Sequence, residues 1–319
     1  MFAVVFPGQG SQKPGMGRSL YEHFPEARGV FETVGSATGR DIATLCFEAD
    51  DDTLRQTQNA QIALYTTGLA AYKALKSRLG DRRPQAAAGH SVGEYTAIAA
   101  ASMVAVEDGA RLVQLRGELM AESGSLRPGT MAAVLGLDRP DVDHVCREAS
   151  TESEVVVVAN DNCPGQLVIS GDVAAVERAS KALVEAGAKR VLPLNVSGAF
   201  HSPLMDEPAQ KMGAVLHQTR FAASQENVIV YSNVTAEPVD LPAGWPVLLE
   251  TQLKNPVRWT ESIRHMRRDE IEIFVECGVG EVLSALIRRI DGSGKTLKVA
   301  DPESLEAAVA ELENLLTSA

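Results

Sequence analysis

The chain has 319 residues, of which 45% are hydrophobic and 23% are charged, and this composition excludes a largely disordered protein. The length allows one large domain, or a large domain with a smaller companion. The net charge of −12 argues against nucleic acid or an anionic membrane as a partner. No apolar run approaches the ~20 residues that a membrane helix needs, so we expect no membrane contact.

The first residues and the cysteines indicate a reducing compartment. The start, M-F-A-V-V-F, has no basic segment, and its apolar run is too short for a signal peptide. The cysteines have no C-x-x-C spacing, which argues against a zinc site or a disulfide framework. We expect reduced, mostly buried thiols and a cytoplasmic location. The cysteines are Cys46, Cys146, Cys163 and Cys277.

The first predicted element is a buried strand at residues 2–6, which ends in the turn P-G-Q-G-S-Q at 7–12. A strand that leads into a glycine-rich turn suits an α/β fold, because ligands bind there at the carboxyl edge of the sheet. The glycines lack the G-x-G-x-x-G spacing, so we predict no dinucleotide site. The turn could equally be a simple chain reversal.

Helices are predicted to fill the chain up to the second strand. Residues 21–38 and 41–49 have helical patterns, and the acidic residues 48–52 predict a solvated loop. Residues 57–79 carry apolar side chains at helical spacing, which predicts a long amphipathic helix that leads into the next strand.

That next strand, residues 86–88, is followed by G-H-S-V-G at 89–93 and then by an alanine-rich helix at 94–101. The pattern G-x-S-x-G between a strand and a helix predicts a nucleophile elbow, with Ser91 exposed at the helix N-terminus. An oxyanion formed beside Ser91 would be stabilised there. A short pattern of this kind also occurs by chance, so only partners elsewhere in the chain can decide its meaning.

A further helix is predicted at 106–123, and the pattern changes near residue 129. The next seventy or so residues predict the order β-α-β-β-α-β, which is the ferredoxin-like arrangement. We predict an α/β fold: a large α/β-hydrolase-like domain from 1–128 and 197–319, with an inserted ferredoxin-like domain at 129–196. A cleft is expected between the two. The insert has predicted strands at 131–136, 155–160, 166–170 and 190–196, and helices at 140–149 and 174–186.

After the insert the chain returns to the pattern of the large domain, without internal repeats. The predicted helices are 208–216, 246–253, 260–268, 282–290 and 303–317, and the predicted strands are 228–232 and 273–276.

A serine hydroxyl is a weak nucleophile and needs a base within hydrogen-bond reach, most often a histidine. His90 is adjacent to Ser91, and an elbow turns neighbouring side chains in different directions. Four other histidines lie in or beside predicted helices among polar residues, which predicts surface positions. His201 stands in the irregular segment V-S-G-A-F-H-S-P, where the insert rejoins the large domain. We therefore predict that the imidazole of His201 contacts the hydroxyl of Ser91.

Four ordered motifs resemble the signatures of malonyl-CoA:acyl carrier protein transacylases of fatty acid synthesis. They are F-P-G-Q-G-S-Q at 6–12, G-H-S-V-G-E at 89–94, G-A-F-H-S at 198–202 and N-P-V-R-W at 255–259. The resemblance is collinear from residue 2 to about residue 290.

The resemblance implies a role for each matching residue. Ser91 takes the malonyl group as an ester and His201 is its base. The oxyanion hole comes from Gln9 and the backbone of Val92. The resemblance also implies that a main-chain carbonyl, matched here by Gln252, orients the histidine, so no triad aspartate is expected. Arg116 pairs with the free malonyl carboxylate, and a bidentate guanidinium suits that task. Without the resemblance, Arg116 would be a surface residue, and Gln9 and Gln252 could be turn and helix-end residues.

The insert contains N-D-N-C-P-G-Q at 160–166, which resembles the segment that lines the family's cleft. Asn160 and Asn162 are therefore predicted to contact substrate. Cys163 stands where serine is more usual, so a contact by that side chain stays open. Phe200, next to His201, predicts a small acyl pocket.

The expected reaction is a ping-pong transfer of malonyl from malonyl-CoA to the phosphopantetheine thiol of an acyl carrier protein, without a metal or organic cofactor. Alternatives are the acyltransferase subunit of a malonate decarboxylase or of a polyketide system, a serine hydrolase, and a noncatalytic carrier-binding subunit. A monomer is expected. Because carrier proteins are acidic, docking requires a basic patch, for which the candidates are Lys189-Arg190, Arg267-Arg268 and Arg288-Arg289.

Overall fold

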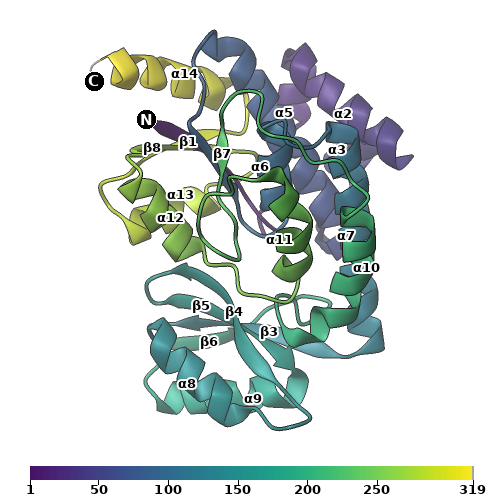
Figure 1. Ribbon diagram of the computed structural model, residues 1–319, viewed down its shortest axis with the longest axis vertical. Helices are drawn as coiled ribbons and strands as arrows, with labels where there is room; N and C mark the ends of the chain where they lie inside the picture. The colour runs from purple at the N-terminus through teal and green to yellow at the C-terminus, as the bar shows by residue number, and fades with distance from the viewer. Residues whose placement is uncertain (318–319) are drawn as a thin grey trace.

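The computed structural model describes residues 1–317 and shows a mixed α/β fold. It contains a five-stranded parallel sheet and a four-stranded antiparallel sheet. The antiparallel sheet, with α8 (Arg139–Ala149) and α9 (Val173–Glu185), forms one end of the molecule, and most other helices surround the parallel sheet (Figure 1).

The parallel sheet has the strand order β7-β2-β1-β8-β9. Its central strand β1 is buried on both faces, which explains its continuous apolar sequence. Phe2, Val4 and Phe6 belong to one buried cluster, whereas Ala3 and Val5 belong to another. The strands are β1 (Phe2–Phe6), β2 (Ala86–Gly89), β7 (Ile229–Val230), β8 (Ile273–Cys277) and β9 (Lys295–Val299).

Helices cover both faces of this sheet. The first cluster joins β1 to α2 (Pro25–Thr38), α5 (Thr57–Leu79), α6 (Gly93–Ala100) and α7 (Val106–Leu126). The second cluster joins β1 and β2 to α12 (Trp259–Arg268) and α13 (Val282–Ile290). A parallel sheet covered on both sides places the strand ends, and the turns that follow them, at one edge of the layer.

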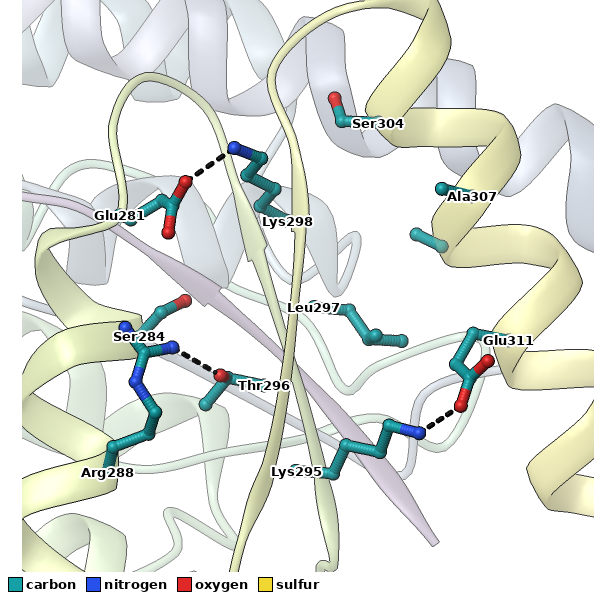
Figure 2. A pocket seen from close by; sticks show the side chains of 11 residues that line it. Glu281, Ser284, Arg288, Lys295, Thr296, Leu297, Lys298, Ser304, Ala307 and Glu311 are labelled. Atoms are coloured by element: carbon teal, nitrogen blue, oxygen red, sulfur yellow. Dashed lines mark hydrogen bonds and ion pairs between the residues drawn. The ribbon is translucent and has the colours of Figure 1, made fainter.

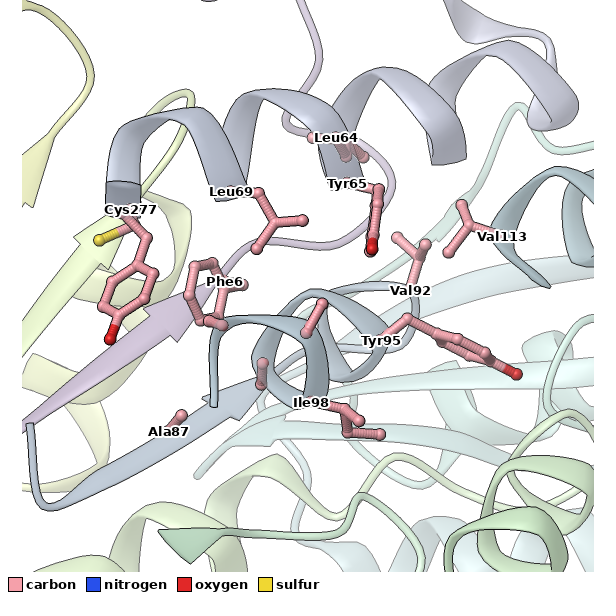
Figure 3. Close-up of a cluster of buried hydrophobic side chains, with 14 of the residues drawn as sticks. Phe6, Leu64, Tyr65, Leu69, Ala87, Val92, Tyr95, Ile98, Val113 and Cys277 are labelled. Atoms are coloured by element: carbon pink, nitrogen blue, oxygen red, sulfur yellow. The ribbon is translucent and has the colours of Figure 1, made fainter. Parts of the chain in front are cut away.

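Helix α5 is not the amphipathic helix that the sequence predicts. It is buried along most of its length, including the polar residues Thr66 and Thr67, whose hydroxyls donate to carbonyls of the preceding turn. Its neighbours α2, α6 and α7 enclose it, so a polar face is not required. Figure 3 shows Leu64, Tyr65 and Leu69 of α5 beside Phe6 of β1 and Val92 at the start of α6.

Two predictions near the N-terminus are wrong in detail. The predicted helix at 21–38 is interrupted at Phe24, which is extended because the following Pro25 disfavours a helical residue before it. The predicted loop at 48–52 contains the start of α4, because the side chain of Asp50 caps that helix through the N–H of Thr53. The helices concerned are α1 (Arg18–His23), α3 (Ile42–Glu48) and α4 (Asp51–Arg55).

The antiparallel sheet follows the predicted order β-α-β-β-α-β and has the spatial order β4-β5-β3-β6. Helices α8 and α9 pack against each other and on this sheet. Strand β4 runs past its predicted end at residue 160, because pairing with β5 continues through a bulge. The strands are β3 (Gly129–Leu135), β4 (Val156–Cys163), β5 (Gln166–Asp172) and β6 (Arg190–Pro193).

Strand β4 also joins the antiparallel sheet to the rest of the molecule. The N–H of Asp161 donates to the carbonyl of Val257, and the N–H of Val257 donates to the carbonyl of Ala159, each at 2.9 Å. The hydroxyl of Thr260, in α12, donates to the Asp161 carboxylate at 2.5 Å. The antiparallel sheet is therefore attached by hydrogen bonds as well as by its two chain connections.

The remaining elements complete the fold. Strand β9 is not predicted by the sequence, since its lysines interrupt the apolar pattern, and β7 is shorter than predicted. All four cysteines are free and buried, as expected. Within residues 1–317, no helix has the length and apolar character needed to cross a membrane. The other helices are α10 (Asp206–Leu216), α11 (Trp245–Gln252), α14 (Pro302–Thr317) and the short 3-10 turns Pro203–Met205 and Pro242–Gly244.

Candidate active site

Ser91 lies in a sharp turn between β2 and α6, with a left-handed backbone φ of 54°. This conformation is uncommon for residues other than glycine. The turn needs small flanking residues: a Cβ on Gly89 would lie 1.8 Å from the carbonyl carbon of Gly93, and a Cβ on Gly93 would lie 2.2 Å from the carbonyl oxygen of Phe6. The predicted elbow is thus present, and its glycines are required by backbone packing.

Asn233, which follows β7, fixes this turn. Its side-chain oxygen accepts from the N–H of Ser91 at 2.8 Å, and its side-chain amide donates to the carbonyl of Gly89 at 2.7 Å. Sequence reasoning missed Asn233, although its position directly after a predicted strand places it at the carboxyl edge of the sheet.

Ser91 and His201, which are 110 residues apart, are brought together. The distance from Ser91 Oγ to His201 Nε2 is 2.8 Å, and His201 Nδ1 lies 2.8 Å from the main-chain carbonyl of Gln252. His201 is buried and has a φ of 56°, so both residues of the pair occupy left-handed backbone conformations. Ser202, the next residue, caps the turn Pro203–Met205.

The surroundings of His201 define its protonation state. Burial, together with the charge of Arg116, lowers the pKa of His201 to about 3. The imidazole is therefore neutral near pH 7. Because a carbonyl only accepts, Nδ1 carries the proton that faces Gln252, and Nε2 accepts from the Ser91 hydroxyl. This is the tautomer that a general base for Ser91 needs.

Arg116, on α7, is fully buried rather than a surface residue. Its Nη2 donates to Ser91 Oγ at 3.1 Å and to the side-chain oxygen of Gln252 at 2.8 Å, while Nη1 donates to Gln61 at 2.6 Å. The guanidinium carbon lies 5.5 Å from the centre of the Tyr95 ring. Among the residues that the structure describes, Nε of Arg116 has no hydrogen-bond partner. A buried donor without an acceptor is costly, which points to a ligand that supplies one.

Gln252 connects the other members of the site. Its side-chain amide nitrogen donates to the carbonyl of Ser91 at 2.9 Å and also to the carboxylate of Glu94. Glu94 in turn accepts from the N–H of Asn233 at 2.8 Å. Burial raises the pKa of Glu94 to about 7, against the opposing effect of these donors and of Arg116. Neither Glu94 nor Gln61 was predicted to belong to the site.

Gln9 and Val92 lie in the turns that follow neighbouring strands. Phe6 of β1 pairs with Gly89 of β2, so these turns leave the sheet side by side. The side chain of Gln9 donates to Thr57 at 3.4 Å. Within residues 1–317, neither the N–H of Gln9 nor that of Val92 donates a hydrogen bond. Both backbone donors are thus available to a ligand.

The residues predicted on the antiparallel sheet have mixed placements. Asn160 is buried in β4 and forms a bridge with Val257. The side-chain oxygen of Asn162 lies 2.8 Å from Nε2 of His90, so it ties the sheet to the elbow. Phe200 is buried in the main core cluster beside His201. Cys163 is buried, with its sulfur 3.9 Å from the Gln166 side-chain oxygen.

The three basic pairs differ in their ion pairing. Arg267 pairs with Asp291, and Arg268 contacts Glu237 and Asp269. Lys189 and Arg190 are exposed, and neither forms an ion pair within the described part of the chain.

The third pair is divided between two locations. Arg289 donates to Gln166 and to the carbonyl of Pro164 on the antiparallel sheet. Arg288 lines a groove of about 470 Å³ between α13, β9 and α14. Figure 2 shows that the cations of this groove have partners: Lys298 with Glu281, Lys295 with Glu311, and Arg288 with Thr296. None of the predicted catalytic or substrate-binding residues lines this groove.

In residues 1–317, no group of three or more histidine, cysteine or acidic side chains is arranged to hold a metal ion. The residues around Ser91 form a nucleophile–base pair with two free backbone donors and a buried guanidinium. Such an arrangement suits attack on a carbonyl whose acyl group carries a negative charge.

Comparisons with known proteins agree with this chemistry. Residues 3–306 match the family model described as acyl transferase domain. The chain is 41% identical over 311 residues to the malonyl CoA-acyl carrier protein transacylase of Bacillus subtilis. This alignment covers 98% of the chain and 97% of the relative.

Solved structures resemble it over a similar length. The malonyl-CoA:acyl carrier protein transacylase of Xanthomonas oryzae superposes with a TM-score of 0.92 at 40% identity, covering 97% of this chain and 98% of that one. A malonyl-transacylase in complex with a type II PKS acyl-carrier protein gives a TM-score of 0.92 at 36% identity, covering 97% and 99%.

Proposed function

The chain belongs to the family of malonyl-CoA:acyl carrier protein transacylases, and we propose that it moves the malonyl group by way of an ester on Ser91. It is an acyltransferase that takes malonyl from malonyl-CoA and delivers it to an acyl carrier protein for fatty acid synthesis. The 2.8 Å contact between Ser91 Oγ and His201 Nε2 is the observation that carries the proposed mechanism.

In the first half-reaction, Ser91 Oγ attacks the thioester carbonyl of malonyl-CoA while its proton moves to His201 Nε2. The negative oxygen that forms accepts from the backbone N–H groups of Gln9 and Val92. When the tetrahedral intermediate collapses, the C–S bond breaks and the proton on Nε2 passes to the sulfur of coenzyme A. The malonyl group remains as an ester on Ser91.

In the second half-reaction, the phosphopantetheine thiol of the carrier protein attacks the ester, and His201 accepts the thiol proton. Collapse of this second intermediate breaks the bond to Ser91 Oγ, which takes the proton back from Nε2. The main-chain carbonyl of Gln252 keeps the imidazole in one tautomer throughout. The chemistry uses only groups of this chain and of the two substrates.

Arg116 is the proposed receptor for the malonyl carboxylate. Its unpartnered Nε and its Nη2, which contacts Ser91, lie on one edge of the guanidinium and would form a bidentate pair with that carboxylate. The adjacent Phe200 would limit the acyl group to a small size. An apolar acyl group would bind poorly beside this buried cation, because it supplies no hydrogen-bond acceptor. Arg116 therefore also argues against a general esterase.

The domain division, the oligomeric state and the cellular location are proposed as well. The strand–elbow–helix unit supports an α/β-hydrolase-like domain at 1–128 and 197–319. The order β4-β5-β3-β6, with two packed helices, supports a ferredoxin-like domain at 129–196. The site residues come from one chain, which supports a monomer. The charge of −12 argues against nucleic acid, and free buried cysteines suit the cytoplasm.

Substrate contacts on the antiparallel sheet are proposed at Asn160 and Asn162. Of the three basic pairs, Lys189-Arg190 is the proposed docking patch for the acidic carrier protein, because its charges are not neutralised by the protein's own acids. Assignment to a malonate decarboxylase or to a polyketide system is an alternative that shares the same half-reactions.

Incubation with labelled malonyl-CoA, followed by mass spectrometry of the peptide that contains Ser91, tests the proposal. We expect a malonyl adduct on Ser91 that disappears when holo-acyl carrier protein is added, and no adduct in Ser91→Ala. Rapid release of free malonate would instead identify a hydrolase, and the absence of any adduct in the unaltered chain would indicate a noncatalytic carrier-binding subunit.

A further inference from the structure

Glu94 is a fully buried carboxylate at the centre of the site that the proposed half-reactions do not use. Its two oxygens have different partners: Oε1 accepts from the N–H of Asn233 at 2.8 Å, and Oε2 accepts from the side-chain amide of Gln252. The carboxylate thus links the start of α6, the segment after β7 and the end of α11.

These contacts determine which way the Gln252 amide points. The nitrogen of that amide faces two acceptors, Glu94 and the carbonyl of Ser91, so the amide oxygen is left for Arg116. Arg116 Nη2 donates to this oxygen at 2.8 Å. A rotated amide would place a donor against the guanidinium and an acceptor against the carboxylate, and both contacts would be lost.

The same chain of contacts balances buried charge. Arg116 and Glu94 are both fully buried, and within residues 1–317 no ion pair joins them directly. The amide of Gln252 stands between them, with its oxygen toward the cation and its nitrogen toward the anion. Each of these buried groups is therefore hydrogen-bonded, while Nε of Arg116 has no partner in the described residues.

We propose that Glu94 is a positioning residue that, through the side chain of Gln252, holds Arg116 in the orientation that binds the acyl carboxylate and so sets the preference for carboxylated acyl groups. This inference rests on the proposed function, because it assumes that Arg116 binds the malonyl carboxylate. Asn233 and Ser91 connect to the same network, but they serve every acyl group alike.

Glu94→Gln is the sharpest test, since the side chain keeps its size but loses one of its two acceptors. Its single oxygen cannot serve both Asn233 and Gln252, and its NH2 group would face one of these donors. We expect kcat/KM for malonylation of Ser91 to fall about tenfold more than kcat/KM for acetylation, since acetyl-CoA has no carboxylate for Arg116. The ratio of the two values is the readout.

The same substitution in an Arg116→Ala background separates positioning from general structural support. If Glu94 acts through Arg116, Glu94→Gln leaves the malonyl-to-acetyl ratio of that variant unchanged. Equal losses for both acyl donors would overturn the proposal. So would an increased ratio in the single variant, which would mean that Glu94 mainly repels the acyl carboxylate, or a further fall in the Arg116→Ala background.

Glu276→Gln is the matched control. Glu276 is also buried and also accepts from two donors, the N–H groups of Leu283 and Ser284, but it does not contact the site. Its substitution is expected to lower thermal stability without changing the ratio. If Glu94→Gln does not fold, Gln252→Met takes its place, because it breaks the link and keeps the carbonyl that holds His201. An unchanged ratio in that variant overturns the proposal.

The unaltered chain shows whether a negative result concerns the proposed function or only the inference about Glu94. A chain that forms no malonyl adduct on Ser91 contradicts the proposed function itself. A chain that forms the adduct, with a ratio that is insensitive to Glu94 and Gln252, contradicts only the inference about Glu94.

Discussion

A carboxylate on the acyl group would accept from Arg116 Nε, which has no partner within residues 1–317, and from Nη2 in place of the contact between Nη2 and Ser91 Oγ. Because hydrogen bonds to charged groups contribute about 1.5–3 kcal/mol each, Arg116→Ala should lower kcat/KM for malonyl-CoA by roughly 10²–10⁴-fold. Acetyl-CoA should be affected much less, so the preference should move from malonyl to acetyl. Rates of Ser91 acylation with the two donors measure this shift.

Arg111→Ala provides the comparison within the same helix. Arg111 is exposed on α7 and pairs with Asp108, so its loss should leave acyl preference unchanged. If Arg116→Ala keeps the original preference for malonyl, Arg116 is not the carboxylate receptor.

His201 should remain unprotonated, and so able to act as a base, at pH values well below the usual histidine pKa of 6.5. Burial and then Arg116 lower its pKa to about 3, so log(kcat/KM) should show no loss of a base near pH 6.5. Arg116→Ala, assayed with acetyl-CoA as donor, removes one cause of the lowered pKa of His201. The acidic limb of its pH–rate profile should therefore move to higher pH. A profile with the same limb in both chains would contradict this electrostatic coupling.

The lowered pKa of His201 also makes the free energy of unfolding depend on pH. Between pH 6.5 and about 3 the unfolded chain binds a proton at residue 201 that the folded chain does not. The contribution of His201 to the free energy of unfolding is therefore complete above pH 6.5 and is lost as the pH falls toward 3.

At this scale the sequence predicts some residues better than others. Ser91 is predictable from its flanking glycines, and Arg116 and Gln252 are predictable only through the family resemblance. Asn233 and Glu94 were missed as members of the site, because their importance lies in hydrogen bonds between segments more than a hundred residues apart. Local pattern places Asn233 at the carboxyl edge of the sheet and Glu94 at the start of a helix, but it does not show that the two residues meet.

The strand–turn–helix element around Ser91 makes a prediction about its glycines. In Gly89→Ala the added Cβ would meet the backbone of Gly93 at 1.8 Å, and backbone cannot move aside without dismantling the elbow. We expect a loss of stability of several kcal/mol or failure to fold, since overpacking against rigid atoms typically costs about 1–3 kcal/mol or more. Denaturant unfolding measures the change.

Gly29→Ala, a glycine-to-alanine change within an ordinary helix, is expected to raise stability instead of lowering it. Gly29 lies within α2, and a Cβ there would have no neighbour within 4 Å. This change should stabilise the chain by about 0.5–1 kcal/mol, because alanine favours helix more than glycine does. Equal effects of the two substitutions would remove the steric argument for the elbow.

The elements themselves were largely predictable, and the errors have physical causes. Strand β1 and the order of the antiparallel sheet follow from apolar runs and turn residues. Apolar side chains at helical spacing predict an amphipathic α5, but its threonines are buried as well, because their hydroxyls bond within the helix. Strand β9 was missed because a strand at the edge of the sheet keeps exposed lysines.

On the scale of the whole molecule, the site depends on how the antiparallel sheet sits against the parallel one. Asn160 and Asn162 belong to β4, and Asn162 reaches His90 beside the nucleophile. The attachment of β4 to the segment at Val257 and to α12 therefore determines the separation between the proposed cleft residues and Ser91. Sequence pattern predicts the two units but not this attachment, because it consists of contacts between segments that lie far apart in the chain.

Thr260→Val tests that attachment with little change in volume. The substitution removes the hydroxyl that donates to Asp161 at 2.5 Å and leaves that buried carboxylate oxygen without its partner, which should cost about 1–3 kcal/mol. We expect a lower Tm and a raised KM for malonyl-CoA, because the wall that carries Asn160 and Asn162 is less well held. Ser262→Ala, on the same helix, removes only a bond to the carbonyl of Arg258 and should change neither quantity appreciably. A lower Tm in Thr260→Val with an unchanged KM would mean that β4 supports the fold without shaping the cleft.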